Sequence, residues 1–284
     1  MVIDEQRERL YNARAAVADH GDFFARWKLR STDFRDSARA RLSLPYGPSA
    51  RQSLDLFMPD NATSPPPLVM FIHGGYWQGL DKFLFSYLAE ALTAAGAAVA
   101  MVGYDLCPAV SIGDIAGQIR AATAWLWSRA GDLAFDRDRL FVSGHSAGGH
   151  LTAMMMASDW PAIDPALPTG LIRGGVSISG LFDLAPLIET SMNRNLGLDA
   201  ASARANSPLF MTPIGDAPLL LVVGGDESAG FRDQSDRLAD AWGSRCRRFD
   251  SPGRNHFSVV EDMADPDSAL FAAMKAMILG NREA

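Results

Sequence analysis

Residues 139–150 read RLFVSGHSAGGH, a short apolar run that leads into a serine set between glycines. The run is typical of a buried β-strand, and the residues after the serine are typical of a helix. Gly144, Ser146 and Gly148 fit the G-x-S-x-G pattern, in which a serine on a tight strand-to-helix turn exposes its hydroxyl. Such a turn leaves no room for side chains on either side of the serine, which explains the glycines. The stretch therefore makes Ser146 a candidate nucleophile.

Strands and helices alternate on both sides of this turn. Besides 139–146, the predicted strands are 67–75, 97–105, 172–180, 217–226 and 245–250. The predicted helices between them are 81–96, 111–131, 148–159 and 231–243. Continuous apolar strands separated by helices predict an α/β fold with a parallel sheet covered on both faces. In such sheets the ligand site lies at the carboxyl ends of the strands.

The length of 284 residues favours a single domain spanning 1–284. Within it, residues 1–40 are expected to form a polar, helical N-terminal segment, and residues 43–59 a hairpin or meander. The turn-rich NATSPPP at 61–67 is expected to be a surface loop. About 182–210 is a long stretch without a clear strand, which we expect to form a small helical cap over the site; an ordinary crossover is the alternative.

The composition limits the partners that can be expected. The net charge is -7 and the pI is about 5.2, which argues against binding to nucleic acid or to an anionic membrane. The N-terminus has no apolar stretch of signal-peptide length, so a cytoplasmic location is the default, with export by another route left open. The two cysteines are expected to be reduced thiols. The expected partner is a small-molecule substrate, and a homodimer is left open.

A serine hydroxyl needs a base to take its proton, and the expected chain order is serine, acid, histidine. The chain has five histidines, and only His150 and His256 follow Ser146. His150 lies four residues along the same helix, where it cannot approach the hydroxyl from the far side. His256 lies in the glycine- and proline-containing loop after the predicted strand 245–250. It is therefore the candidate base.

The base needs a carboxylate that orients it, at the end of a strand between the serine and the histidine. Asp226 directly follows the apolar run LLLVVGG and is the predicted orienting acid. The adjacent Glu227 and Asp250, at the end of the next strand, are the alternatives. Asp105 also ends a strand, but it precedes Ser146 and does not fit the order.

Cleavage of an acyl group also needs amide donors for the developing oxyanion. The amide of Ala147 is expected to supply one of them. The other is expected from the loop after the strand 67–75, where lipases and esterases carry an HGGG-type motif and this chain has His73-Gly74-Gly75. Gly74 and Gly75 let the backbone come close to a substrate.

Taken together, these motifs resemble the kynurenine formamidase-like branch of the α/β-hydrolase superfamily. The segments that carry the resemblance are HGGYWQ (73–78), GHSAGGH (144–150), SGLFDL (179–184), GGDES (224–228) and RNHFS (254–258). The similarity runs from about residue 66 to the C-terminus, and YNARAAVADH at 11–20 also looks like the start of bacterial members. The chain has Tyr76-Trp77 where hormone-sensitive-lipase-type esterases have another glycine and an aromatic residue, which favours the formamidase-like branch.

The resemblance implies an α/β-hydrolase fold and a serine hydrolase that acts through an acyl-enzyme. The implied substrate is an aryl formamide such as N-formylkynurenine; the alternative is a carboxylesterase on the same framework. The residues carried over are Ser146 as nucleophile, Asp226 as orienter, His256 as base, and Gly74, Gly75 and Ala147 in the oxyanion hole, with the Tyr76 amide as a further candidate. A non-catalytic ligand-binding protein is a distant alternative, because it would be expected to lose a member of this triad.

Three aromatic residues are candidates for binding the substrate. Tyr76 and Trp77 adjoin the predicted oxyanion loop, where a flat aromatic substrate could pack against them. Packing of Trp77 under the loop, as part of the core, is an equal alternative. Phe182 follows the strand 172–180, at the start of the expected cap. No cofactor is expected, and five scattered histidines do not make a metal site.

Overall fold

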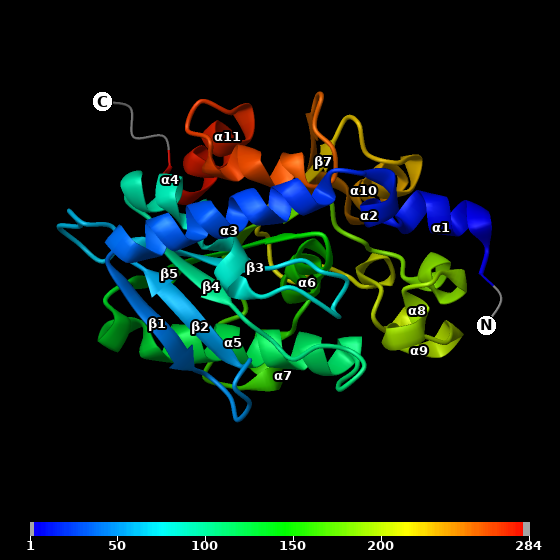
Figure 1. Ribbon diagram of the computed structural model, residues 1–284. Helices are drawn as coiled ribbons and strands as arrows, with labels where there is room; N and C mark the ends of the chain where they lie inside the picture. The colour runs from blue at the N-terminus through cyan, green and yellow to red at the C-terminus, as the bar shows by residue number, and fades with distance from the viewer. Residues whose placement is uncertain (1–2, 281–284) are drawn as a thin grey trace.

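The computed structural model describes residues 3–280. This part of the chain contains an eight-stranded sheet with the strand order β1-β2-β4-β3-β5-β6-β7-β8 (Figure 1). The strands are β1 (Ala40–Pro45), β2 (Ser53–Phe57), β3 (Pro67–Ile72), β4 (Ala98–Val102), β5 (Asp136–His145), β6 (Ile172–Ile178), β7 (Leu219–Gly224) and β8 (Cys246–Ser251).

The sheet is mostly parallel. Strand β2 runs antiparallel to both β1 and β4, and every other neighbouring pair is parallel. In register, Ile72 of β3 lies opposite Gly144 of β5, and His145 of β5 lies opposite Ile178 of β6. The carboxyl ends of these three central strands are therefore level. The α/β-hydrolase fold expected from the sequence is confirmed, including the antiparallel β1–β2 pair in the segment 43–59.

Helices connect and cover the strands. The α-helices are α1 (Glu5–Tyr11), α2 (Ala13–Ala16), α3 (His20–Ser37), α4 (Ala89–Ala94), α5 (Ile112–Leu133), α6 (Ala147–Met156), α7 (Trp160–Ile163), α8 (Asn193–Leu196), α9 (Ala200–Ala205), α10 (Ala229–Trp242) and α11 (Ala269–Leu279). The 3-10 helices are η1 (Lys82–Leu88), η2 (Ala185–Glu189), η3 (Pro208–Phe210), η4 (Gly243–Arg245) and η5 (Ser258–Ala264). The single helix expected over 81–96 is thus a 3-10 helix followed by a short α-helix.

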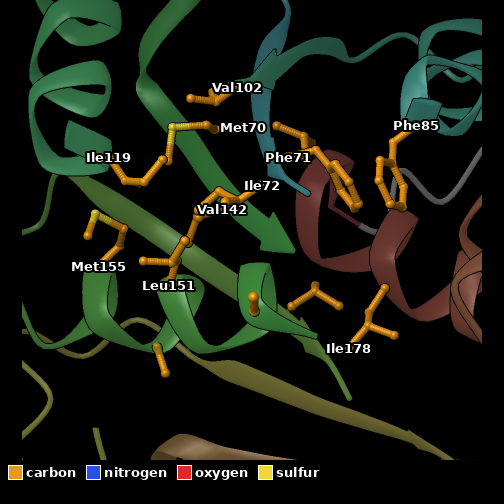
Figure 2. Close-up of a cluster of buried hydrophobic side chains, with 14 of the residues drawn as sticks. Met70, Phe71, Ile72, Phe85, Val102, Ile119, Val142, Leu151, Met155 and Ile178 are labelled. Atoms are coloured by element: carbon orange, nitrogen blue, oxygen red, sulfur yellow. The ribbon is translucent and has the colours of Figure 1, made fainter. Parts of the chain in front are cut away.

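The helices form a layer on each side of the sheet. In Figure 1, α3, α4 and α11 lie above the sheet and α5 lies below it. Side chains of β3 alternate between these two layers (Figure 2): Met70 and Ile72 point toward Ile119 of α5 and toward α6, while Phe71 packs against Phe85 of η1. Such alternation explains why the central strands are continuous apolar runs, since both faces are buried.

The N-terminal segment packs onto the hydrolase core through α3. Arg35 on this helix forms a buried ion pair with Asp55 of β2, with 2.7 Å between guanidinium and carboxylate. Arg35 also donates a hydrogen bond to the hydroxyl of Ser86 on η1. Residues 1–2 of the expected 1–40 segment lie outside the described residues. None of the helices in residues 3–280 has the length and apolar character needed to cross a membrane.

Candidate active site

Ser146 lies on the sharp turn between β5 and α6, at the carboxyl edge of the sheet. Its backbone has φ 57° and ψ -116°, a conformation that non-glycine residues rarely adopt. The amide of Ser146 donates to the carbonyl oxygen of Ile178 on β6 at 2.8 Å, which holds the turn in place. A Cβ atom on Gly148 would lie 1.9 Å from the carbonyl oxygen of Ile72, so the steric reason given for this glycine is confirmed.

His256 reaches Ser146 from the loop after β8. Its Nε2 atom lies 3.1 Å from Oγ of Ser146, and its Nδ1 atom lies 2.7 Å from Oε2 of Glu227. A carboxylate only accepts hydrogen bonds, so Nδ1 carries the proton and Nε2 is free to accept one from the serine hydroxyl. All three residues are at least 95% buried, with 3%, 5% and 5% of Ser146, Glu227 and His256 exposed. The arrangement can move a proton from Ser146 to His256.

The structure corrects the expected position of the acid: Glu227, not Asp226, lies beside His256. The turn after β7 points the side chain of Asp226 to solvent, while its amide donates to the carbonyl oxygen of Arg254 at 3.0 Å. Glu227 follows one residue later and points inward. The other open alternative, Asp250, is exposed and pairs with Arg248 at 2.8 Å.

Two further groups fix the orientation of the Glu227 carboxylate. Its Oε1 atom accepts a hydrogen bond from the hydroxyl of Ser179 at 2.5 Å and one from the amide of Gly224 at 2.8 Å. Its Oε2 atom is left for His256. Ser179 directly follows β6, and Gly224 is the last residue of β7, so the ends of two neighbouring strands build this support. The sequence analysis assigned neither residue a role.

His145 is a third residue to which the sequence analysis assigned no role. Its Nε2 atom lies 2.8 Å from the carbonyl oxygen of His256, and the rings of the two histidines lie 4.9 Å apart. Burial lowers the pKa of His145 well below its usual value, and the charge of a protonated His256 would lower it further. The His145 ring is therefore neutral, and its Nε2–H group donates a hydrogen bond to the carbonyl oxygen of His256. In the sequence, the only indication of this supporting role is that His145 immediately precedes the nucleophile Ser146.

His150, which the sequence analysis rejected as the base, lies away from the serine hydroxyl. Its Nε2 atom bonds to the carbonyl oxygen of Asn206 at 2.7 Å, and its ring packs edge-on against Trp77 at 4.9 Å between centroids. Burial lowers its pKa to about 4. His150 is therefore a neutral core residue that ties α6 to the segment after α9.

The loop after β3 passes directly beside Ser146. Nδ1 of His73 lies 2.7 Å from the carbonyl oxygen of Gly74 and donates to it. Because C=O and N–H point in opposite directions across a trans peptide, the amide of Gly75 points away from the His73 ring. Gly75 has φ 114°, and a Cβ atom there would lie 2.2 Å from the carbonyl oxygen of Gly79, so only glycine fits.

The residues expected to donate to the oxyanion occupy different positions relative to Ser146 and the cavity. Gly75 and Tyr76 line a cavity together with Ser146, whereas a Cβ atom on Gly74 would lie 3.2 Å from Cβ of Ser146, so Gly74 packs directly against the serine. Ala147 is the first residue of α6. Among the described residues, no partner accepts a hydrogen bond from the amides of Gly74, Gly75, Tyr76 or Ala147. All four N–H groups therefore stay candidates for the oxyanion hole.

The cavity over Ser146 has a volume of about 510 Å³ and includes His145 and His256 in its lining. Five aromatic side chains form much of its wall: Phe24, Trp27, Tyr76, Phe85 and Phe257. This volume lies in the usual range for pockets that bind small organic ligands.

Of the three aromatic residues expected to contact substrate, one lines the cavity. Tyr76 is in its wall, and the Tyr76 hydroxyl donates to the backbone carbonyl of Tyr11. Trp77 and Phe182 are 0% and 1% exposed and do not line the cavity, so both expectations are wrong. Trp77 packs in the core against His150, as in the alternative, and Phe182 is buried at the start of the segment 182–210.

Two segments far from the serine in sequence close the cavity. Residues 12–14, at the start of α2, form one side, and residues 191–195, around the start of α8, form another. The side-chain Nδ2 of Asn195 donates to the side-chain oxygen of Gln78 at 2.8 Å, which joins the second segment to the loop after β3. The expected cap region thus contributes residues to the cavity. The N-terminal contribution was missed, because a polar helical segment gives no sequence signal of where it packs.

No group of three or more histidine, cysteine or acidic side chains in residues 3–280 is arranged to hold a metal ion. Cys107 and Cys246 are free thiols, as expected from their number and spacing.

Comparisons with known proteins point to one superfamily. The family model BD-FAE matches residues 54–240. A kynurenine formamidase from Salmo salar is 30% identical over 253 residues, which cover 86% of this chain and 84% of that protein. A protein from Silicibacter sp. TM1040, provisionally called a thioesterase, aligns over 96% of this chain and 98% of its own at 39% identity, with a TM-score of 0.84. Esterase B from Lactobacillus rhamnosis, inhibited by a tributyrin phosphonate, shares the fold, with a TM-score of 0.71 at 21% identity over 94% of each chain.

Proposed function

Because this chain belongs to the BD-FAE family of α/β-hydrolases, we propose that it is a serine hydrolase of aryl formamides, with N-formylkynurenine as the representative substrate. The observation that carries the proposal is the hydrogen-bonded triad of Ser146, His256 and Glu227, whose serine and histidine line a cavity with aromatic walls. The similarity to kynurenine formamidases over most of both chains supports the substrate class.

In the first half of the reaction, Oγ of Ser146 attacks the formyl carbon while Nε2 of His256 takes the hydroxyl proton. Glu227 holds the imidazole in the required tautomer and stabilises the imidazolium that forms. The amides of Gly75, Tyr76 and Ala147 are the donors for the negative oxygen of the tetrahedral intermediate. His256 then protonates the departing aryl amine, the C–N bond breaks, and a formyl ester remains on Ser146.

In the second half, water attacks the formyl ester. His256 takes a proton from that water, and the second tetrahedral oxyanion uses the same amides. Collapse of this intermediate breaks the C–O bond to Ser146, and His256 returns the proton to the serine oxygen. The products are formate and the free aryl amine, and the enzyme is regenerated without any other reactant.

The volume of the cavity is sufficient for a small acyl group and a large leaving group. A formyl group needs almost no acyl space, so nearly all of the 510 Å³ is available to the aromatic amine. Aromatic side chains favour offset or edge-to-face packing with a flat ring, in addition to the area that they bury. Phe24, Trp27 and Phe257 also contact one another, which gives this wall a fixed surface for such packing.

A carboxylesterase or thioesterase is the second candidate. The same triad would cleave an ester or a thioester, and the cavity has space for a short acyl chain. The 39% identity to the protein from Silicibacter sp. TM1040 is the observation that favours this alternative.

The experiment that separates the two candidates is kcat/KM for N-formyl-L-kynurenine against phenyl acetate, on one preparation and with Ser146→Ala as the blank. A formamide value at or above the ester value is the expected result. An ester value larger by several orders of magnitude would overturn the formamidase proposal and support the esterase.

A further inference from the structure

The cavity over Ser146 differs in charge from the protein as a whole. The chain carries 33 acidic and 26 basic side chains, for a net charge of -7. The described lining of the cavity nevertheless contains two arginines, Arg14 and Arg194, and no aspartate or glutamate. A cleft lined by one sign of charge raises the local concentration of ligands of the opposite sign.

Arg14 lies in the N-terminal wall of the cavity. Its guanidinium carbon is 5.7 Å from the ring centroid of Phe24, and one of its terminal nitrogens would be 3.9 Å from a Cβ atom on Gly79; both neighbours also line the cavity. Within the described chain, no carboxylate lies within ion-pair distance of Arg14. The wall itself is held in place, because the Tyr76 hydroxyl donates to the Tyr11 carbonyl and Ser228 Oγ donates to that of Leu10 at 2.5 Å.

Arg194 comes from the other wall, on α8. The charge of Arg194 acts on the carboxylate of Glu8, but this carboxylate already accepts hydrogen bonds from other residues. It accepts from the amide and hydroxyl of Ser191 at 2.7 and 2.6 Å and from the side chain of Asn12 at 2.7 Å. Burial raises the pKa of Glu8, but these hydrogen bonds and the charge of Arg194 outweigh it, so the net pKa is lowered. Glu8 is thus an ionised support that joins the two walls, and Arg194 forms no ion pair with it.

We propose that Arg14 and Arg194 bind a carboxylate on the substrate, so that the enzyme selects aryl substrates that carry an anionic group beyond the ring. This inference rests on the proposed function and adds to it a specificity for substrates that carry a carboxylate. The aromatic part of the substrate lies against Phe24, Trp27 and Phe257, the scissile carbonyl lies at Ser146, and the carboxylate lies between the two walls. Guanidinium groups suit this role, because they are permanently charged and can bind a carboxylate through two parallel hydrogen bonds.

The test compares substrates that differ only in that charge. The formamide pair is N-formyl-L-kynurenine and its α-carboxamide, and the ester pair is 4-acetoxybenzoate and 4-acetoxybenzamide. Each is measured with the wild type, Arg14→Gln, Arg194→Gln and the double variant. The matched control is Arg9→Gln on α1, which removes the same charge from a side chain that is 73% exposed and outside the cavity.

We expect the wild type to prefer the carboxylate member of each pair by about 10-fold or more in kcat/KM. The double variant should lose most of this preference, because KM for the carboxylate member rises. Arg9→Gln should keep the preference. In the wild type the preference should shrink in 0.5 M NaCl, because salt screens charges at the open mouth of a cavity.

Equal kcat/KM values within both wild-type pairs, or an unchanged preference in the double variant, would overturn the inference. Failure of the proposed function is distinguishable from this. An enzyme that cleaves the esters but neither formamide contradicts the formamidase proposal, and its charge selection is then read from the ester pair. A preference in that pair that disappears in the double variant supports the inference independently.

Discussion

Nδ1 of His256 lies 2.7 Å from a carboxylate oxygen of Glu227, the residue immediately after the solvent-exposed Asp226. The two acids are neighbours in one turn, yet only the second one reaches the imidazole. Its other oxygen is held by Ser179 and Gly224. Glu227 is therefore the acid expected to orient the base.

Glu227→Gln should lower kcat by about 10⁴, as loss of the orienting acid does in other triads. The amide removes the negative charge that stabilises the imidazolium, and an NH₂ group facing Nδ1 donates a hydrogen bond instead of accepting one, which favours the wrong imidazole tautomer. Asp226→Asn is the matched control and should change kcat less than about twofold, since surface changes away from such features have small effects. Steady-state kinetics on both variants tests the pair. A large loss in Asp226→Asn with an active Glu227→Gln would reverse the assignment.

Gly148→Ala should abolish activity and lower the free energy of unfolding by about 1–3 kcal/mol. The added methyl group would lie 1.9 Å from the carbonyl oxygen of Ile72, and that backbone atom cannot move without shifting β3. Gly117→Ala lies inside α5, with no atom within 4 Å of the added methyl group. It should instead raise the free energy of unfolding by about 0.5–1 kcal/mol. Urea unfolding measures both. Equal effects of the two substitutions would show that the close approach at the serine turn does not exist.

Phe24→Ala should weaken substrate binding, whereas Phe182→Ala should lower the stability of the fold. Phe24 lines the cavity, so its loss should lower kcat/KM for an aromatic substrate by about 10-fold, mainly through KM. Phe182 is 1% exposed and outside the cavity, so its loss should lower the free energy of unfolding by about 3–5 kcal/mol with little change in KM. Kinetics and urea unfolding on both variants decide this. A raised KM in Phe182→Ala would return that residue to the substrate site.

The protein should lose stability as the pH falls from about 6.5 toward 4. Burial lowers the pKa of His150 to about 4 in the folded chain, against an ordinary value of 6.5. Between these values the unfolded state binds a proton that the folded state does not, so acid favours unfolding; the stability is fully present above pH 6.5. Buried His73, whose pKa is also lowered to about 4 by burial, acts in the same direction.

His150→Gln removes one of these titrations while keeping a side-chain N–H that can donate to the carbonyl oxygen of Asn206. The decrease in the free energy of unfolding between pH 7 and pH 5 should therefore be smaller in His150→Gln than in the wild type. Urea unfolding at both pH values measures it. Identical decreases in the two proteins would mean that His150 is not buried in the neutral form.

The positions of the parallel strands along the chain and the place of Ser146 could be predicted because both depend on local patterns. Apolar runs such as 67–75 and 217–226 are long enough to identify buried strands, and glycines on both sides of a serine identify the sharp turn. His256 followed from chain order and from its place in the loop after β8. These features need only neighbouring residues and the general rules for parallel sheets.

The rest depends on the direction of individual side chains and on distant contacts. Spacing places Asp226 and Glu227 at the same strand end, but only the turn after β7 decides which of them points inward. Tyr76 and Trp77 both have positive φ values, 53° and 54°, and this unusual backbone sends one side chain to the cavity and the other to the core. The wall around Arg14 is built by contacts across some 200 residues, such as that between Ser228 and Leu10, which no local pattern reveals.

The central claim, covalent catalysis by Ser146 with His256 as its base and Glu227 as the acid that orients His256, is tested most directly by intact-protein mass spectrometry after treatment with a fluorophosphonate. The account predicts one adduct on the wild type, mapped to Ser146 by peptide analysis, no adduct on Ser146→Ala, and much slower labelling of Glu227→Gln than of Asp226→Asn. A wild-type protein that hydrolyses substrate but remains unlabelled, or an equal adduct on Ser146→Ala, would contradict it.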